Sequence, residues 1–147
     1  MKKTILLYIA FCFCPFVFSQ ERYDSSNQDK ANSYLEKLQT AYVNGNYKNH
    51  KLYSDSLLSV AKEHNLYRMQ VLALNNQAIF HNSTSERETS IRLYHEALKI
   101  CELIPDDFKA KAVVLVNMGN TYNNIGEYDK AIEAMKPTPE IIVCDDV

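Results

Sequence analysis

His95 and Glu96 begin the residue pattern in this 147-residue chain that comes nearest to a metal site. In the zinc pattern H-E-x-x-H, two histidines four residues apart share one helix face and bind the metal together. Lys99 stands where the second histidine would be. The remaining histidines are dispersed, at His50, His64 and His81. We therefore expect His95 and Glu96 to form a solvated helix surface, and we predict no metal site.

Paired carboxylates could support acid–base catalysis, and the chain has such pairs at 106–107 and 145–146. The first pair follows Pro105, where Asp106 or Asp107 is expected to cap the start of a helix. The second pair lies near the end of the sequence. The three glycines assemble neither a G-x-S-x-G elbow nor a phosphate-binding loop. We expect a non-enzymatic protein without a cofactor, and we rank a hydrolase or metalloenzyme last among the alternatives.

The first twenty residues, MKKTILLYIAFCFCPFVFSQ, are typical of a secretory signal peptide. Lys2 and Lys3 supply the basic start, and an apolar run extends from Ile5 to Phe18. Cleavage is expected after Ser19, so residues 1–19 form the signal. The exported product would be periplasmic or secreted.

Two alternatives for this segment are a transmembrane helix and a lipid anchor. The apolar run has 14 residues, about 21 Å as a helix against a bilayer core of about 30 Å. Pro15 also interrupts it. Cys12 and Cys14 follow phenylalanines, whereas the anchored cysteine of bacterial lipoproteins follows a small residue. We expect no stable membrane span after cleavage.

Removal of residues 1–19 leaves 14 basic and 18 acidic residues, a net charge of −4. No basic cluster could follow a phosphate backbone, so we expect no nucleic-acid partner. Cys101 and Cys144 remain after cleavage. They could pair in an oxidising compartment, but Cys101 falls on the apolar face of a predicted helix. A buried free thiol is the favoured interpretation.

Apolar residues recur at spacings of three and four from about Ala31 to Met135, which predicts helices throughout. Gly45, Asn65 and Gly126 suit the left-handed residue that ends a helix. Ser85-x-x-Glu88 matches the capping box that starts one. Six helices are predicted, at about 29–43, 47–63, 67–82, 86–103, 107–124 and 128–136.

The predicted helices form repeats. Leu35, Leu74 and Leu115 begin three matching registers, 39 and 41 residues apart. Equivalent positions further along are Leu38, Gln77 and Met118; Gln39, Ala78 and Gly119; and Tyr42, His81 and Tyr122. Because each pair needs a neighbour to bury its apolar face, this period predicts an all-α solenoid of about three antiparallel helix pairs. The pairs span residues 31–136, between a linker (20–30) and an irregular tail (137–147).

The segment NMGNTYNNIGEYDKAIEAM, residues 117–135, resembles a tetratricopeptide repeat, whose signature runs L-G-x-x-Y, then A-x-x-x-F. The matching residues are Met118, Gly119, Tyr122, Gly126, Tyr128, Ala131 and Met135. The preceding unit matches through Leu74, Ala78, Tyr94 and Ala97, with His81 in place of the first-helix tyrosine. In such a repeat the small residue allows close helix contact, and Tyr122 and Tyr128 would fill the adjoining gap.

The resemblance implies a scaffold that binds a protein or peptide in a concave groove lined by the first helix of each pair. Asparagines there would hold the backbone of an extended peptide. The implied groove residues are Asn75, Asn82, Asn120, Asn123 and Asn124, with Asn76 and Asn117 along its wall. The alternative is that the asparagines reflect genome composition alone.

Long repeats of this kind also resemble extracytoplasmic sensor regions of bacterial membrane signalling proteins, such as histidine kinases or transcriptional regulators. A sensory segment is therefore the alternative function. Pro137 and Pro139 are expected to stop the last helix after about two turns. The apolar face of the last pair would then be open, which predicts a frayed end, self-association through this repeat, or a truncated gene.

Overall fold

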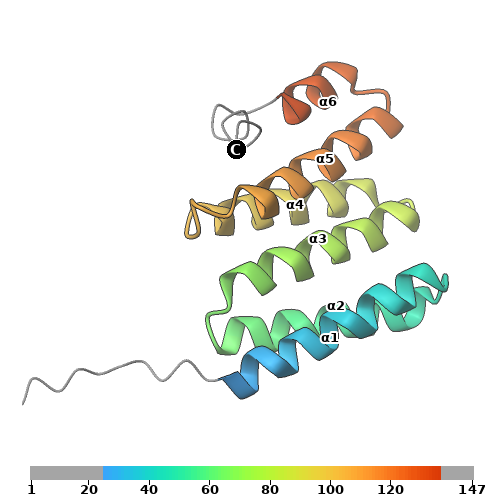
Figure 1. Cartoon of the computed structure of the whole chain (residues 1–147). Helices are drawn as coiled ribbons and strands as arrows, with labels where there is room; N and C mark the ends of the chain where they lie inside the picture. Colours follow the sequence, from blue (N-terminus) through green and yellow to red (C-terminus); the bar gives the residue numbers. More distant parts are fainter. Residues whose placement is uncertain (1–24, 137–147) are drawn as a thin grey trace, which may run out of the picture.

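The computed structural model describes residues 25–136 (Figure 1). This range contains six α-helices and no strand, which confirms the predicted all-α class. The helices are α1 (Ser25–Val43), α2 (Tyr47–Glu63), α3 (Tyr67–Ser83), α4 (Arg87–Cys101), α5 (Phe108–Asn124) and α6 (Tyr128–Met135). The predictions on the signal peptide, the cysteines at 12, 14 and 144, and the tail at 137–147 lie outside the described residues.

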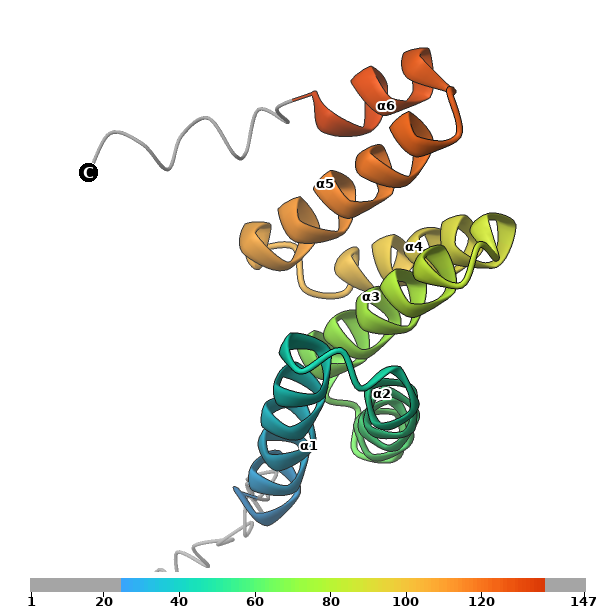
Figure 2. The same cartoon turned by 90° about the vertical axis from the view of Figure 1, so that its right-hand side faces the viewer.

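Successive helices form pairs that stack along one direction, α1 with α2, α3 with α4, and α5 with α6 (Figures 1 and 2). One apolar core cluster joins the first pair to α3, through residues such as Leu38, Leu57 and Ala73. A second cluster joins α3, α4 and α5, with contributions from Leu74 and Tyr94. Each pair thus completes its core with its neighbour, as expected for a solenoid.

The first helix begins at Ser25, earlier than the predicted start at about 29. Residues 25–30, predicted as linker, therefore belong to α1. The apolar periodicity starts only at Ala31, the first buried residue of this helix. Because the preceding turns are polar throughout, the periodicity gave no signal for them.

One tight turn recurs at four of the five helix junctions. Gly45, Asn65, Ser85 and Gly126 each have positive φ, between 53° and 81°. The next amide then bonds back to a carbonyl in the last helical turn, as from Asn46 N to Ala41 O at 2.8 Å. This is the Schellman arrangement.

The predicted capping box at Ser85 is wrong. Ser85 has φ +67° and ends α3 instead of starting α4. The N-cap of α4 is Glu86, which makes no side-chain capping bond. Ser85 stands one residue before the N-cap and has a left-handed backbone, whereas a capping residue occupies the N-cap itself, so Ser85 cannot take the capping role.

The turns fix the register between repeats and correct the predicted one. Leu38, Ala78 and Gly119 each lie seven residues before their turn residue, and all three are buried. The predicted equivalent Gln39 is exposed. Similarly, the buried Ala41 is the equivalent of His81 and Tyr122, whereas the predicted Tyr42 is 53% exposed. The repeat period, counted between turn residues, is 40 and then 41 residues.

Gly119 allows α5 and α6 to approach closely. A Cβ built on it would lie 2.6 Å from Met135 Cγ and 3.3 Å from the carbonyl oxygen of Ala131. The expected role of the small residue is thereby confirmed. Tyr122 packs against the core, but Tyr128 is 64% exposed and does not fill the gap. Met135 occupies the space beside Gly119.

The junction between α4 and α5 differs from the others. It contains Pro105 and ends at Asp107, whose carboxylate accepts a hydrogen bond from Ala110 N at 3.1 Å. This confirms the predicted N-cap. Arg68, in the first turn of α3, forms an ion pair with the same carboxylate. This ion pair therefore connects the α4–α5 junction to α3, the first helix of the preceding pair.

Candidate functional site

An exposed stripe runs along α5. Val113, Val116, Asn120 and Asn124 follow at i, i+3, i+7 and i+11, a spacing that places them on one helix face. Val113 is 46% exposed and Val116 is 49% exposed. Asn120 and Asn124 are also exposed. The stripe combines apolar contact area with amide donors and acceptors.

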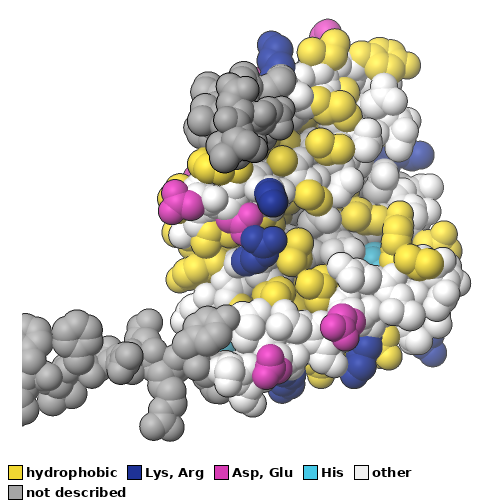
Figure 3. Space-filling view, viewed as in Figure 1, with side chains coloured by type: hydrophobic (Ala, Val, Ile, Leu, Met, Phe, Trp, Pro, Cys, Tyr) yellow, Lys and Arg dark blue, Asp and Glu magenta, His cyan; other side chains and the backbone are white. Residues whose placement is uncertain are grey.

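The packing of α5 explains why this face is open. Ala110, Val114 and Thr121 are buried and lie together on another face, while Gly119 faces α6. The stripe lies on the face of α5 that these contacts leave exposed. Figure 3 shows hydrophobic side chains interspersed with polar atoms along the face on which α1, α3 and α5 are seen.

Three of the five asparagines assigned to the groove are exposed together near the end of α5: Asn120, Asn123 and Asn124. Asn82 is half-buried near the end of α3. Asn75 is only 4% exposed. Its Oδ1 accepts a hydrogen bond from Asn117 Nδ2 at 2.9 Å, because α5 lies against this part of α3. Asn75 is thus a contact between two first helices and not a freely presented amide.

The two asparagines predicted to line the wall also bond within the protein. Asn117 donates to Asn75 as described. Asn76 Nδ2 donates to the carbonyl oxygen of Leu72 at 2.7 Å, and its Oδ1 lies 3.4 Å from His50 Nε2. These amides connect neighbouring helices, a use that satisfies polar groups at a partly buried interface.

His50 is a buried residue that the sequence pattern did not single out. It is 1% exposed, and its ring centroid lies 5.4 Å from that of Tyr42 and 6.4 Å from that of Phe80. Burial lowers the pKa of His50, and the hydrogen bond with Asn76 opposes this shift. The imidazole is therefore neutral at pH 7 and belongs to the interface between α2 and α3.

A hollow of about 660 Å³ lies at the α6 end of the stack. Its lining residues come from both helices of the last pair: Asn120, Asn123, Tyr128, Ala131, Ile132, Met135 and Lys136. Most of its area is apolar, and Tyr128 and Ile132 are more than half exposed. The predicted open face of the last pair is this surface.

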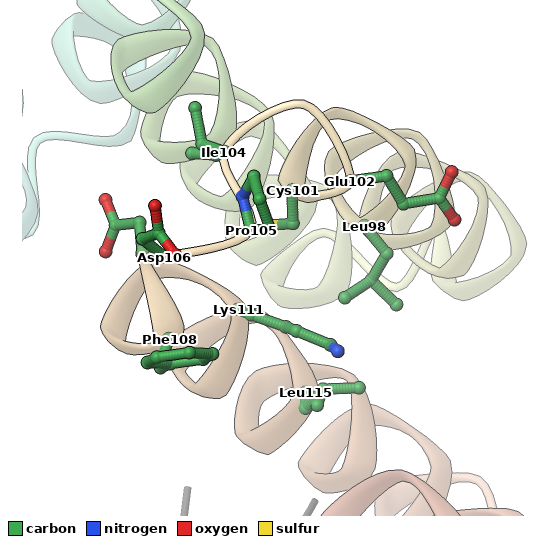
Figure 4. A pocket seen from close by; sticks show the side chains of 10 residues that line it. Leu98, Cys101, Glu102, Ile104, Pro105, Asp106, Phe108, Lys111 and Leu115 are labelled. Atoms are coloured by element: carbon green, nitrogen blue, oxygen red, sulfur yellow. The ribbon is translucent and has the colours of Figure 1, made fainter. Parts of the chain in front are cut away.

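A second hollow, of about 580 Å³, lies beside the α4–α5 junction (Figure 4). Leu98 and Cys101 from α4 line it together with Leu115 from α5, and the Lys111 side chain extends across it. Its lining is mainly apolar. The geometry provides a surface for contact.

Cys101 in this hollow is a buried free thiol, 5% exposed, as expected. Burial raises the pKa of Cys101; Asp107 raises it further, and Lys111 opposes the shift. A protonated thiol is a poor nucleophile. Among residues 25–136, no three His, Cys, Asp or Glu side chains gather closely enough to hold a metal ion.

His95 and Glu96 occupy the surface predicted for them. His95 is exposed, and Glu96 Oε1 lies 3.5 Å from Lys62 Nζ of α2. Within residues 25–136, no helix combines the length and apolar character needed to cross a bilayer.

Comparison with known families gives a match over the second half of the described residues. Residues 70–136, which run from α3 to the end of α6, match the family model of the tetratricopeptide repeat. A search of curated protein sequences finds no significant match to the chain. Tetratricopeptide repeats generally act as scaffolds for protein–protein interaction. The match covers the two helix pairs that carry the exposed stripe and the hollow at the α6 end.

Proposed function

We propose that this chain, whose residues 70–136 match the tetratricopeptide repeat family, is a non-enzymatic scaffold that binds an extended peptide segment of another protein. The binding surface is the exposed face of the first helices, centred on α5. The observation that supports this proposal most is the α5 stripe of Val113, Val116, Asn120 and Asn124. Asn123 extends it toward α6.

The chemistry of the stripe suits an extended backbone. Each asparagine amide offers donors and an acceptor, which match the N–H and C=O groups of a peptide. The two valines offer apolar contact to peptide side chains. An exposed pair of β-branched residues one helical turn apart is stiff at χ1, so binding would cost little side-chain entropy.

A binding experiment tests this surface. Residues 20–147 would be screened against a random peptide library, and the affinity of the selected peptides would be measured by fluorescence anisotropy. The variant Val113→Ser/Val116→Ser/Asn124→Ala should bind them roughly tenfold or more weakly. Asn120 and Asn123 stay intact because they also line the hollow beside α6.

The matched control is Arg92→Ala/His95→Ala, two exposed positions on α4. It should bind as the original chain does. Equal affinity of the stripe variant and the original would reject this surface. Circular dichroism of both variants establishes that they retain the same helix content.

We also propose that the chain is exported, and that the peptide surface works outside the cytoplasm. The pattern of residues 1–19 supports export. The 40- and 41-residue spacing of the turns exceeds the usual ~34 of the family, as in the extracytoplasmic sensor regions noted above. Fusion of residues 1–30 to alkaline phosphatase, which is active only after export, tests this. Absence of activity from the fused enzyme, with the fusion protein present, would reject export.

A further inference from the structure

The turns define equivalent positions in the second helix of each pair. The residues five and nine positions after the turn are His50 and Ser54 in α2, Ser90 and Tyr94 in α4, and Ala131 and Met135 in α6. The four residues in the first two pairs are at most 1% exposed. Met135, in contrast, is 40% exposed. Ala131 is 7% exposed, so the same helix face is closed in two repeats and, in the third, is open at the position of Met135.

The first helix of the following pair closes this face. α3 covers α2, where Asn76 bonds to His50 and the Phe80 ring packs beside the same imidazole. α5 covers α4, where the fully buried Thr121 hydroxyl interacts with Tyr94. Both covering helices have 17 residues. The same interface therefore occurs twice along the stack, and in both cases the first helix of the next pair covers it.

At the third position, the described residues leave the 660 Å³ hollow. Ile132 is 61% exposed there, beside Met135 and Tyr128. The hollow is lined by both α5 and α6, the two helices of one pair, as a following first helix would require. Ala131 and Met135 occupy the register of the two internal interfaces, and Ile132, the equivalent of Lys51 and Ile91, lies at their edge.

We propose that this end face binds an amphipathic α-helix of a partner protein, seated as α3 and α5 are seated on the pairs before them. The contact stripe of the partner follows from those two helices. In α5 it consists of Ala110, Val114, Met118 and Thr121, and in α3 of Met69, Ala73, Gln77 and Phe80. The partner helix therefore presents its contact residues at i, i+4, i+8 and i+11, with an alanine-sized residue at i or i+4.

Charge specifies one more position on the partner. Lys136 is the only charged residue among those that line the hollow. Its equivalent in the first pair, ten residues after the turn, is Asp55, which accepts a hydrogen bond from Gln77 Nε2 at 2.8 Å. Gln77 is the i+8 residue of α3. The partner helix accordingly carries a carboxylate at i+8, opposite Lys136.

A labelled peptide with the sequence of residues 107–125 and the change Met118→Glu serves as the probe, because it carries the contact residues of α5 that begin at Ala110, with a carboxylate at i+8. Anisotropy titration with residues 20–147 should give saturable binding. Ile132→Asp in the protein should weaken binding roughly tenfold or more. Leu52→Asp on α2, a site of similar exposure (54% against 61%), is the matched control and should bind normally.

A charge exchange distinguishes binding at the proposed site from nonspecific binding. The peptide with Met118→Lys should bind the original chain less tightly than the Met118→Glu peptide, and the protein variant Lys136→Glu should reverse this order. The Val113→Ser/Val116→Ser/Asn124→Ala variant should bind the helical probe with unchanged affinity. This inference rests on the proposed scaffold function, but the two binding surfaces can therefore fail independently of each other.

Three outcomes would overturn the proposal. The first is equal binding to the original chain and to Ile132→Asp, or no binding at all. The second is a dimer of the original chain that Ile132→Asp dissociates while the peptide fails to compete, which would assign the face to a second copy. The third is peptide binding only after deletion of residues 137–147, which would assign it to the chain's own following segment.

Discussion

Asn117 of α5 donates a hydrogen bond to Asn75 of α3, with 2.9 Å between Nδ2 and Oδ1. The two residues are 42 positions apart in the sequence, so the bond joins consecutive repeats. Asn75 is 4% exposed. An amide in such a position stabilises the interface only while its partner is present, because an unpaired buried acceptor has lost its hydration.

We predict energetic coupling between these two amides. Asn117→Ala leaves the buried Asn75 oxygen without its donor and should lower the free energy of unfolding by about 1–3 kcal/mol. Asn75→Ala also removes the bond. The double variant should therefore lose clearly less than the sum of the single losses. Urea unfolding of the four proteins measures this, and strict additivity would show that the bond contributes nothing.

Ser85 offers a prediction at a turn. Its φ of +67° is one that a residue with Cβ adopts at a cost, whereas Gly45 and Gly126 occupy the equivalent position elsewhere. Ser85→Gly should raise the free energy of unfolding by a few tenths to about 1 kcal/mol. Ser83→Gly, two residues earlier and still helical, should change it in the opposite direction because glycine weakens a helix. Thermal unfolding of both variants measures the direction of each change in stability. A loss of stability in Ser85→Gly would contradict a backbone cost at the left-handed turn.

The helices themselves could be predicted from the sequence because two independent signals agreed. Apolar spacing marked their length, and Gly45, Asn65 and Gly126 marked their ends. Alignment by leucines gives the wrong register for the first repeat, because Leu35 and Leu38 both fit a leucine pattern. The turn residue decides between them, since it sets which side chain points into the pair.

The candidate site was predictable only in part for a related reason. Helical spacing locates Asn120 and Asn124 on one face of α5, but it does not tell which faces the next repeat covers. Asn75 lies in α3, the central first helix, where α5 closes much of the surface. The hollow beside α6 follows from the short last helix, and it was anticipated as an open face without its lining residues.

Gly119 and Met135 should be coupled through their contact. Gly119→Ala improves helix propensity by about 1 kcal/mol, but the new Cβ would lie 2.6 Å from Met135 Cγ. Met135→Ala removes that overlap. We therefore expect Gly119→Ala to be more favourable by about 1 kcal/mol in the Met135→Ala background than in the original chain. Chemical unfolding of the four proteins tests this, and an identical effect in both backgrounds would contradict the close approach.

His50 should make stability fall in mildly acidic solution. Its pKa is lowered in the folded chain by burial, from the ordinary 6.5. Above pH 6.5 the imidazole is neutral in both states, so it adds no pH dependence. As pH falls below 6.5, the unfolded chain binds a proton that the folded chain excludes. The free energy of unfolding should then decrease by up to about 1.4 kcal/mol per pH unit, until the folded-state pKa is reached.

Comparison of variants isolates this contribution from that of other titrating groups. His50→Gln should have a lower overall stability, since it alters a buried contact, but a shallower loss between pH 6.5 and 5 than the original chain. Arg92→Gln, at an exposed position on α4, leaves His50 in place and should retain the original slope. Urea unfolding at half-unit pH intervals measures the three slopes. If His50→Gln and the original chain lose stability in parallel, the imidazole is not held neutral between Tyr42 and Phe80, and the interface between α2 and α3 tolerates its charge.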